Sequence, residues 1–445
     1  MGVFRAYDIR GVYGQDLTDD LAFAVGQAAA RFLKAKKMVV GRDARTSSEP
    51  LTAKVIAGIT SVGCDVIDIG ETTTPLFYFS VNTFKTEGGI MITASHNPAQ
   101  YNGLKIVGPE AVPIGSETGL KEIERLSGEP AVAAPDSGRG GVDHEKLIDD
   151  YINLIIEMTG ATEQNFGEMR IVADASNGMA SLMLKNLFKK INVNVIPLHW
   201  DIDETFPHHG PDVSQRQNLE QLSAKVREMK ANFGVAFDGD GDRIAFVDDK
   251  GDMIWPDHIL GLLYSLMNQP RTVYDLRISR AVKRWISKGV PCRVGYAFIK
   301  KEMRERGAEL GGELSGHFYF KDMHYSESPM LVMLKIMISL LHSEKTLSEI
   351  MAPFRANSFS GEINIELKDE KAKEKIFENL KNKYSDGYLN EMDGVMIEYP
   401  DWWFNIRASN TEPVVRLVVE ADTVSLMKEK TEELKSLIEH ASASE

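Results

Sequence analysis

A repeated alternation of short β-branched runs with longer helical stretches leaves this chain few folds to adopt. Each run ends in a turn rich in Gly and Asp, and a stretch with helical spacing of apolar residues follows most of them. The runs are "KMVVGRDAR" (37–45), "CDVIDIGETTTP" (64–75), "MRIVADASNG" (169–178), "NVNVIPLHWD" (192–201), "FGVAFDGDGDR" (233–243) and "RTVYDLRIS" (271–279). This alternation predicts βαβ units and parallel strands, the pattern of α/β proteins.

Aspartates recur at the ends of the predicted strands. Four runs place one at or just past the expected C-terminal end of the strand: Asp43, Asp174, Asp238 and Asp275. In open α/β sheets ligands bind at that edge. The recurrence therefore predicts related α/β domains that face one cleft.

The chain is too long for a single core. Its 445 residues predict about three domains of about 150 residues each. Candidate boundaries fall in the Gly/Pro/Ser/Ala-rich segment 127–141, near 247–257 and near 352–361. After 361 the pattern changes to strand, helix, strand pair, helix, which predicts a smaller α+β domain.

Charge and composition exclude several classes of protein. The net charge of −14 argues against a binder of duplex nucleic acid, which needs a basic face. The N-terminus lacks the apolar stretch of a signal peptide, and the longest apolar run, 330–341, is too short to span a membrane and predicts a buried helix. The two cysteines, Cys64 and Cys292, have no metal-binding spacing and are expected to be buried free thiols. We expect a cytoplasmic protein, whose apolar helix faces fit a monomer or a homo-oligomer.

The segment "DGDGDR" (238–243) predicts a divalent cation site. Three carboxylates alternate with glycines directly after an apolar strand: Asp238, Asp240 and Asp242. The glycines let the backbone turn tightly enough for the carboxylates to converge. An EF-hand is excluded because its loop needs Gly and Glu where this chain has Arg and Asp. A solvated acidic turn is the other interpretation, but crowded acids without a cation raise one another's pKa values, which favours a metal.

A candidate anion site lies in "FNIRASNTEPVVRL" (404–417). After a strand, a turn gathers small donors around a guanidinium: Arg407, Ser409, Asn410 and Thr411. Such a turn can form a nest of backbone N–H groups for phosphate. Ser, Asn and Thr also cluster in ordinary turns, so the segment alone leaves both interpretations open.

The segment "GGELSGHFYF" (311–320) places Glu313, Ser315 and His317 at alternate positions. Alternate residues of an extended chain face the same side. A carboxylate and a hydroxyl on one face suit sugar hydroxyls, and His317 is a candidate for proton transfer. A single histidine is more often structural, so the segment alone does not decide.

Three arginines lie in loops of the N-terminal part: Arg10, Arg42 and Arg45. Loop arginines are usually solvated or paired with carboxylates. Because these three stand beside a predicted strand edge, they are also candidates to balance phosphate charge.

The segment "MITASHNPAQYNGLK" (91–105) places Ser95 beside His96 after an apolar run. A Ser-His-Asp hydrolase usually carries its serine on a G-x-S-x-G elbow, and the flanking residues here differ. Side chains of adjacent residues also diverge, so His96 is poorly placed as the base of its neighbour. A helix-cap or turn role stays open for Ser95.

Taken together, these segments resemble the α-D-phosphohexomutase superfamily, closest to its phosphomannomutase/phosphoglucomutase branch. "YDIRG", "TASHNP", "DGDGDR", "GELSGH" and "RASNTEP" appear in the family's order and span essentially the whole chain. The resemblance implies an α/β fold of three related α/β domains with mixed sheets, plus a C-terminal α+β domain, around a central cleft. The expected domains are 1–142, 143–247, 248–354 and 355–445.

The resemblance also implies a role for each motif. Ser95 carries a phosphoryl group and, with the three aspartates of the acidic segment (Asp238, Asp240 and Asp242), holds Mg²⁺. The groups expected around the transferring phosphoryl group are Arg10, His96, Lys105, Arg243 and His317, and the choice of Lys105 or His317 as proton carrier stays open. The residues expected to grip sugar hydroxyls or the non-reacting phosphate are Glu313, Ser315, Arg407, Ser409, Asn410, Thr411 and Arg416.

The implied reaction is reversible phosphoryl transfer between the 1- and 6-positions of a mannose or glucose phosphate. Phosphoserine donates, a bound 1,6-bisphosphate turns end for end, and the other phosphate returns to serine. Mg²⁺ is the implied cofactor, hexose 1,6-bisphosphate the activator, and small-molecule sugar phosphates the only partners, with no nucleic acid and no membrane. The alternatives are phosphoglucosamine mutase or phosphopentomutase within the superfamily, and a phosphatase-like hydrolase or a non-catalytic sensor outside it.

Two departures from the family pattern bear on the choice of sugar. After "GELSGHFYFKD" the chain reads "MHYSESPML" (323–331), where Glu327 is the nearest acid. The segment "CRVGYAFIKKEM" (292–303) carries Arg293 and Tyr296, for which only a general phosphate or sugar role is expected.

Overall fold

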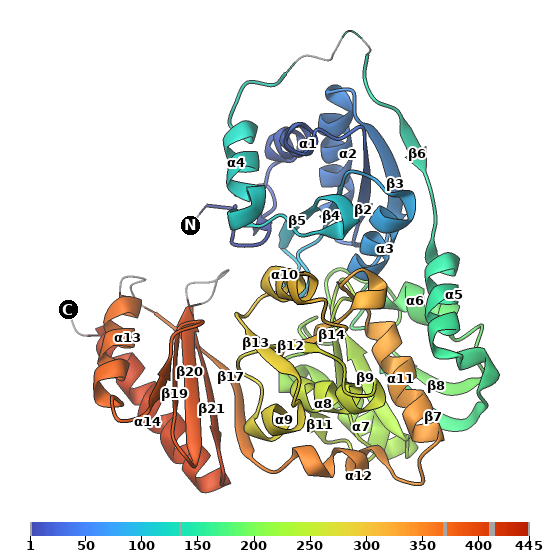
Figure 1. Cartoon of the computed structure of the whole chain (residues 1–445). Helices are drawn as coiled ribbons and strands as arrows, with labels where there is room; N and C mark the ends of the chain where they lie inside the picture. The colour runs from blue at the N-terminus through green and yellow to red at the C-terminus, as the bar shows by residue number, and fades with distance from the viewer. Residues whose placement is uncertain (1, 133–135, 137, 368–371, 409–413, 444–445) are drawn as a thin grey trace.

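The computed structural model describes residues 2–132, 136, 138–367, 372–408 and 414–443. Within these ranges four sheets follow one another along the chain, and each has helices packed against it (Figure 1). The first three sheets mix parallel and antiparallel strands, and the fourth is antiparallel throughout. The predicted fold class, three α/β units and a C-terminal α+β unit, is confirmed.

The first sheet has the strand order β1-β5-β4-β2-β3-β6. Its strands are β1 (Ile9–Val12), β2 (Lys37–Arg42), β3 (Asp65–Glu71), β4 (Gly89–Ile92), β5 (Tyr101–Val107) and β6 (Val142–His144). Its helices are α1 (Asp19–Leu33), α2 (Ser48–Ser61), α3 (Thr74–Phe84) and α4 (Lys121–Ser127). Along β2, Met38 and Val40 join the core under α1 and α2, whereas Val39 joins a second core with Phe77 of α3. Helices on both faces bury residues 38–41 of this strand, which explains its apolar run.

The second sheet, in the order β11-β10-β9-β7-β8, repeats this plan. Its strands are β7 (Phe166–Asp174), β8 (Val193–Leu198), β9 (Phe233–Phe237), β10 (Ile244–Val247) and β11 (Met253–Ile254). The helices of this part are α5 (Ile148–Thr159), α6 (Ala180–Leu187) and α7 (Glu220–Met229).

The third sheet has the order β13-β12-β14-β15-β16. Its strands are β12 (Thr272–Asp275), β13 (Gly289–Cys292), β14 (Leu310–Gly312), β15 (Phe318–Phe320) and β16 (Ser326–Glu327). Its helices are α8 (Pro256–Leu266), α9 (Arg280–Trp285), α10 (Tyr296–Arg306), α11 (Pro329–Leu341) and α12 (Leu347–Met351).

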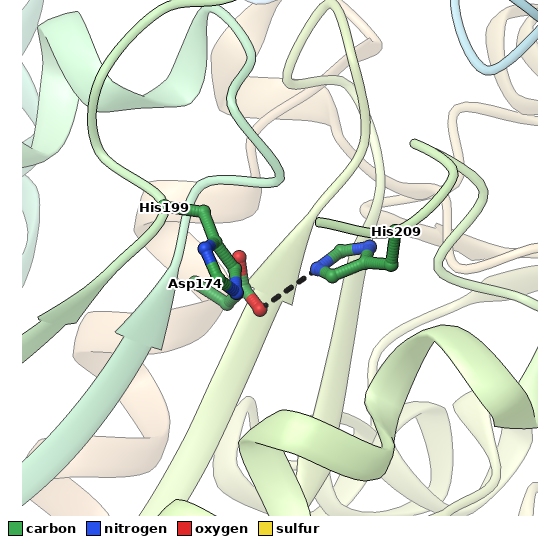
Figure 2. A group of neighbouring side chains, drawn as sticks. All are labelled: Asp174, His199 and His209. Carbon is green, nitrogen blue, oxygen red and sulfur yellow. Dashed lines mark hydrogen bonds and ion pairs between the residues drawn. The ribbon is translucent and has the colours of Figure 1, made fainter. Parts of the chain in front are cut away.

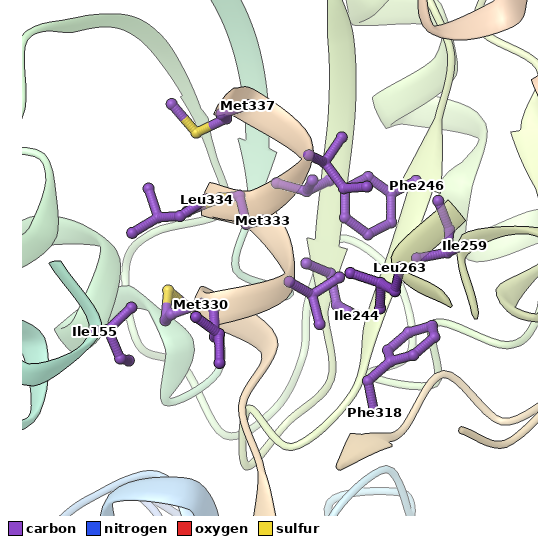
Figure 3. Packing of buried hydrophobic residues seen from close by; sticks show 14 of the residues in the cluster. Ile155, Ile244, Phe246, Ile259, Leu263, Phe318, Met330, Met333, Leu334 and Met337 are labelled. Carbon is purple, nitrogen blue, oxygen red and sulfur yellow. The ribbon is translucent and has the colours of Figure 1, made fainter. Parts of the chain in front are cut away.

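The second and third units share one hydrophobic core. The apolar run predicted to be a buried helix is α11, and its side chains Met330 and Leu334 pack in one cluster with Ile155 of α5 (Figure 3). The same cluster contains Phe246 of the second sheet and Phe318 of the third. Because this core is continuous, the sheet edges of the two units are held in a defined relation to each other.

The C-terminal unit is a sheet with helices on one face. Its strands, in the order β17-β21-β20-β19-β18, are β17 (Ser358–Glu366), β18 (Tyr388–Asn390), β19 (Val395–Glu398), β20 (Trp402–Ala408) and β21 (Val414–Ala421). The helices α13 (Ala372–Lys383) and α14 (Val424–Ala443) contribute Leu380 and Leu434 to its core. From the other face, Trp403 and Val418 pack against Leu276 and Leu314 of the third unit. Among the described residues, no helix is long and apolar enough to cross a membrane.

The strand-end aspartates build the same turn in all three α/β units. Each accepts the backbone N–H two residues further on: Arg45 to Asp43 at 3.1 Å, Ser176 to Asp174 at 2.8 Å and Arg277 to Asp275 at 2.9 Å. In the first and third units that residue is an arginine, whose guanidinium also pairs with the aspartate. The shared turn supports the prediction that these units are related.

Candidate active site

Ser95 lies on a strained turn just after β4. Its φ is +52°, a left-handed conformation that non-glycine residues seldom adopt. The Arg45 guanidinium donates to the carbonyl groups of Ser95 and Asn97 at 3.0 and 2.7 Å, so Arg45 shapes this turn. The Ser95 hydroxyl donates to Asp238 Oδ2 at 3.0 Å and lies 3.2 Å from His96 Nδ1. Burial and the nearby Arg243 hold the pKa of His96 well below its usual value, so its ring is neutral.

The acidic segment begins at Asp238, directly after β9, and lies against the serine turn. Gly241 has a φ of +70°, as the predicted tight turn requires. Gly239 is needed for another reason, because a Cβ there would stand 2.6 Å from the Ser95 carbonyl oxygen. Asp238 Oδ1 accepts the backbone N–H groups of Asp242 and Arg243 at 3.0 and 3.1 Å, which closes the loop.

The three carboxylates of this segment are buried and converge. One oxygen from each of Asp238, Asp240 and Asp242 lies within 4.8 Å of the others. Asp240 Oδ1 is a buried acceptor without a hydrogen-bond partner among the described residues. Burial and the two neighbouring aspartates raise the pKa of Asp238 well above its usual value. Three converging carboxylates, one of them with an orphaned acceptor oxygen, fit a hard divalent cation such as Mg²⁺.

Lys105 of β5 reaches the same carboxylates. Its Nζ lies 2.8 Å from Asp240 Oδ2 and 2.6 Å from Asp242 Oδ2. Burial opposes the charge of Lys105, but the two aspartates outweigh it and raise the pKa of this lysine well above its usual value. Lys105 is therefore a buried ammonium next to the serine turn.

His317, Glu313 and Ser315 form one hydrogen-bonded group on the third unit. His317 Nε2 lies 3.1 Å from Asp242 Oδ1, and its Nδ1 lies 3.1 Å from a Glu313 oxygen and 2.9 Å from Ser315 Oγ. Burial opposes protonation of His317, yet Asp242 raises its pKa to about 9. Glu313 also accepts from the Gly295 N–H at 2.9 Å, and its pKa is held at about 2 against the effect of burial, chiefly by His317. The predicted trio is therefore assembled, and it contacts the acidic segment through His317.

Arginines from the third and fourth units gather around one carboxylate. Glu362 of β17 lies 3.6 Å from Arg407 and 3.2 Å from Arg416, and Arg277 also pairs with it. Burial opposes ionisation of Glu362, but Arg277 and the other two arginines lower its pKa to about 2. The predicted residues Ser409, Asn410 and Thr411 lie outside the described residues.

A cavity of about 620 Å³ reaches the serine turn at His96 and the acidic segment at Arg243, whereas Ser95, Lys105 and the three aspartates are not among its lining residues. Its lining comes from all four units and includes Arg10, His96, Arg243, Ser315, Glu362 and Arg416. Arg10 is held by Asp8 at 2.6 Å and by Asn97 at 2.5 Å. Arg42 instead pairs with Glu71, and neither Arg42 nor Arg45 is among the residues that line this cavity.

Arg277, Glu362 and Tyr7 also line the cavity, although none of them was predicted to be a site residue. A signal for Arg277 was present, since Asp275-x-Arg277 repeats the spacing of Asp43-x-Arg45, and Tyr7 opens the motif "YDIRG". Nothing in the local sequence marks Glu362. Tyr7 contacts the site because its hydroxyl donates to the Val294 carbonyl at 3.0 Å, across the first and third units.

The three α/β units, the α+β unit and the serine and acidic turns at one cavity define a member of the α-D-phosphohexomutase superfamily. The four domain models of phosphoglucomutase/phosphomannomutase match in order: alpha/beta/alpha domain I at 1–130, domain II at 149–251, domain III at 255–356 and the C-terminal domain at 362–436. This chain belongs to the phosphoglucomutase/phosphomannomutase family.

Individual relatives match over nearly their whole length. The chain is 35% identical to a phosphomannomutase of Methanocaldococcus jannaschii, covering 99% of this chain and 98% of that protein. It is 34% identical to a phosphomannomutase/phosphoglucomutase of Pseudomonas aeruginosa, covering 98% and 94%. A crystal structure of a phosphoglucomutase/phosphomannomutase family protein from Burkholderia thailandensis superposes with a TM-score of 0.86 at 29% identity, covering 99% and 98%.

Proposed function

We propose that this chain is a Mg²⁺-dependent phosphohexomutase, an isomerase that moves a phosphoryl group between the 1- and 6-positions of mannose and/or glucose phosphate. The observation that carries the proposal is the position of the Ser95 hydroxyl, 3.0 Å from Asp238. The next residue, His96, lines a cavity that Arg277, Arg407 and Arg416 also line. Phosphoglucosamine mutase and phosphopentomutase are not favoured, because the full-length relatives are named for mannose and glucose phosphates.

The cavity has two poles with different chemistry. At the serine pole, Arg243 and Lys105 supply fixed positive charge within reach of the acidic turn. At the other pole, Arg277, Arg407 and Arg416 suit a phosphate that does not react. A reacting pole and a holding pole are what a bound 1,6-bisphosphate needs in order to turn end for end and return its second phosphate to Ser95.

Mg²⁺ fits the three buried carboxylates of the acidic segment together with Ser95. When bound, the ion neutralises charge on phosphoryl oxygens, which is the main requirement of phosphoryl transfer. The chain's own residues orient the nucleophile: the strained turn and Arg45 present the Ser95 hydroxyl toward Asp238 and His96.

Proton transfer and sugar binding involve the third unit. Side chains of adjacent residues were expected to diverge, but the strained turn brings His96 Nδ1 within 3.2 Å of the Ser95 hydroxyl, so a neutral His96 can accept its proton. A protonated His317 can donate a proton to a sugar oxygen. Lys105, paired with two aspartates, is better suited to charge neutralisation. Glu313 and Ser315 present a carboxylate and a hydroxyl for sugar hydroxyls. Their position next to His317 places sugar and proton donor together.

Intact-mass measurement tests the central step. After incubation with glucose 1,6-bisphosphate, which also serves as the activator, the wild-type protein should gain about 80 Da, one phosphoryl group, and lose it to hexose 6-phosphate. Ser95→Ala should gain nothing and show no turnover, whereas Ser127→Ala, at the half-buried end of α4, should behave as wild type. Release of free phosphate in place of isomerised sugar would indicate a phosphatase, and near wild-type turnover by Ser95→Ala would refute the mechanism.

A coupled assay with the 1-phosphates of mannose, glucose, glucosamine and ribose resolves the substrate. We expect turnover of the mannose or glucose compound or of both.

The buried free thiols Cys64 and Cys292 agree with the proposed cytoplasmic location.

A further inference from the structure

A second cluster of metal-ligating side chains lies in the second α/β unit, apart from the acidic segment. Figure 2 shows the Asp174 carboxylate at the end of β7 with the rings of His199 and His209 beside it. One ring nitrogen of each histidine and one oxygen of Asp174 lie within 4.8 Å of one another. Asp174 is fully buried, and the side chain of His209 is 7% exposed.

The repeated strand-end turn shows what this cluster lacks. In the first and third units, the strand-end aspartate pairs with the guanidinium two residues further on. In the second unit that position is Ser176, whose hydroxyl donates to the Phe237 carbonyl instead. Asp174 Oδ2 faces His209 Nε2 at 3.0 Å, so this buried carboxylate has imidazoles where its two counterparts have a permanent cation.

Each ring nitrogen of His209 has a partner, and one of the two partners is itself a metal-ligating group. Its Nδ1 lies 2.9 Å from the Gly210 carbonyl oxygen, which can only accept, so Nδ1 carries the proton. Nε2 lies 3.0 Å from Asp174 Oδ2, so a metal ion bound between these two atoms replaces the hydrogen bond that they make in its absence. A backbone carbonyl that fixes the tautomer in this way is the usual outer partner of a metal-ligating histidine.

We propose that Asp174, His199 and His209 bind a transition-metal ion of the zinc type, separate from the Mg²⁺ site. Two imidazoles and one carboxylate suit zinc, whereas an all-oxygen set suits magnesium. Tetrahedral zinc with ligands at about 2.0–2.1 Å places those ligands about 3.4 Å apart, so the cluster closes by at most about 1.4 Å on binding. Water completes the coordination.

The ion ties the segment 199–209 to the end of β7. This segment contributes Thr205 and Phe206 to the cavity wall, and the residues after it contribute Asp212, which lies 3.8 Å from Arg243. Metal binding therefore stabilises the wall of the second unit without contacting the reacting atoms.

Cobalt titration tests the proposal, because Co²⁺ reports its coordination by visible absorption. The full-length protein is stripped with chelator and titrated in excess Mg²⁺, both as wild type and as Asp240→Asn, so that the acidic segment does not contribute. We expect one Co²⁺ per chain, with the strong absorption of four- or five-coordinate nitrogen ligation, displaced by Zn²⁺. His199→Gln and His209→Gln should each lose it, while His144→Gln, which alters an exposed histidine beside Asp68, should keep it.

Hydrogen exchange gives a second readout that does not depend on a variant's fold. With Zn²⁺ at about 100 times its dissociation constant, amide exchange of the wild-type segment 199–210 should slow by up to about 100-fold if opening releases the ion. The proposal would be overturned if Asp240→Asn took up no Co²⁺, or if both histidine variants took it up as the wild type does. It would also be overturned if Zn²⁺ left the amide exchange of residues 199–210 unchanged.

Discussion

The buried ion pair between Lys300 and Glu327 offers a sharp test of the structure. Lys300 is on α10 and Glu327 on β16; their side chains are 0% and 1% exposed, and Nζ lies 2.6 Å from Oε2. At an effective dielectric of about 20, that separation corresponds to an attraction of about 6 kcal/mol. Burial outweighs it: the pKa of Lys300 is lowered to about 8, which means a net penalty of about 3 kcal/mol on its charge.

Removal of either charge leaves its partner buried and uncompensated. We expect Glu327→Gln and Lys300→Met each to lower the free energy of unfolding by about 3–5 kcal/mol. The double variant buries no charge and should lose far less than the sum, giving a coupling energy of about 3 kcal/mol or more. The assay is equilibrium urea unfolding at pH 7.5, with equal m-values across the cycle so that the differences are comparable.

The same helix provides the control. Lys301 and Glu305 form an exposed pair at 4.0 Å, and the cycle Lys301→Met/Glu305→Gln should give a coupling energy below about 0.5 kcal/mol. The reasoning would be refuted if the single Lys300 and Glu327 variants each lowered the free energy of unfolding by less than about 1 kcal/mol. It would also be refuted if the losses of these two single variants added up to the loss of the Lys300/Glu327 double variant.

The remaining predictions concern a loop contact, a phosphate contact and a titration. Gly239→Ala should lower kcat by about 100-fold, because its Cβ would stand 2.6 Å from the Ser95 carbonyl oxygen and displace the nucleophile. Gly128→Ala should not, because its Cβ would come no nearer than 3.5 Å to its neighbours, and equal activity of both variants would contradict the contact. Arg407→Ala should raise KM for hexose phosphate by about 10-fold or more while the protein still accepts phosphate from the bisphosphate; an unchanged KM would remove Arg407 from the holding pole. Burial raises the pKa of Glu420 to about 7, above its unfolded value, so its contribution to stability is complete below about pH 4.3 and is lost as the pH rises through 7. Relative to Glu420→Gln, the wild type should lose about 3 kcal/mol of unfolding free energy between pH 4.5 and 7.5, and parallel pH profiles would contradict this.

Local pattern was enough for much of the fold. The apolar run at 330–341, predicted to be a buried helix, lies within α11, because a run of apolar residues indicates burial. The helix α5, Ile148–Thr159, was not predicted. Its buried face packs both against α6 of its own unit and against α11 of the third unit.

The residues of the candidate site also include some that were predicted from the sequence and others that were not. The residue types at Ser95, Asp238 and Glu313 were predicted because each stands in a short motif whose spacing has a chemical purpose. The role of Arg45 was not, since donation to the carbonyl groups of the serine turn depends on a contact across the domain. The carboxylate of Glu362 among three arginines depends likewise on how β17 meets the third unit.

The chain's own pattern therefore determines the class of fold, the order of its motifs and the kinds of atom brought to the cleft, because these follow from apolar spacing and from residues a few positions apart. Only the tertiary structure decides which charged groups lie close enough to form ion pairs. Lys105 and Asp242 lie 137 residues apart in sequence yet 2.6 Å apart in space. Distance and burial set the strength of such a pair, and neither quantity is encoded in any single segment.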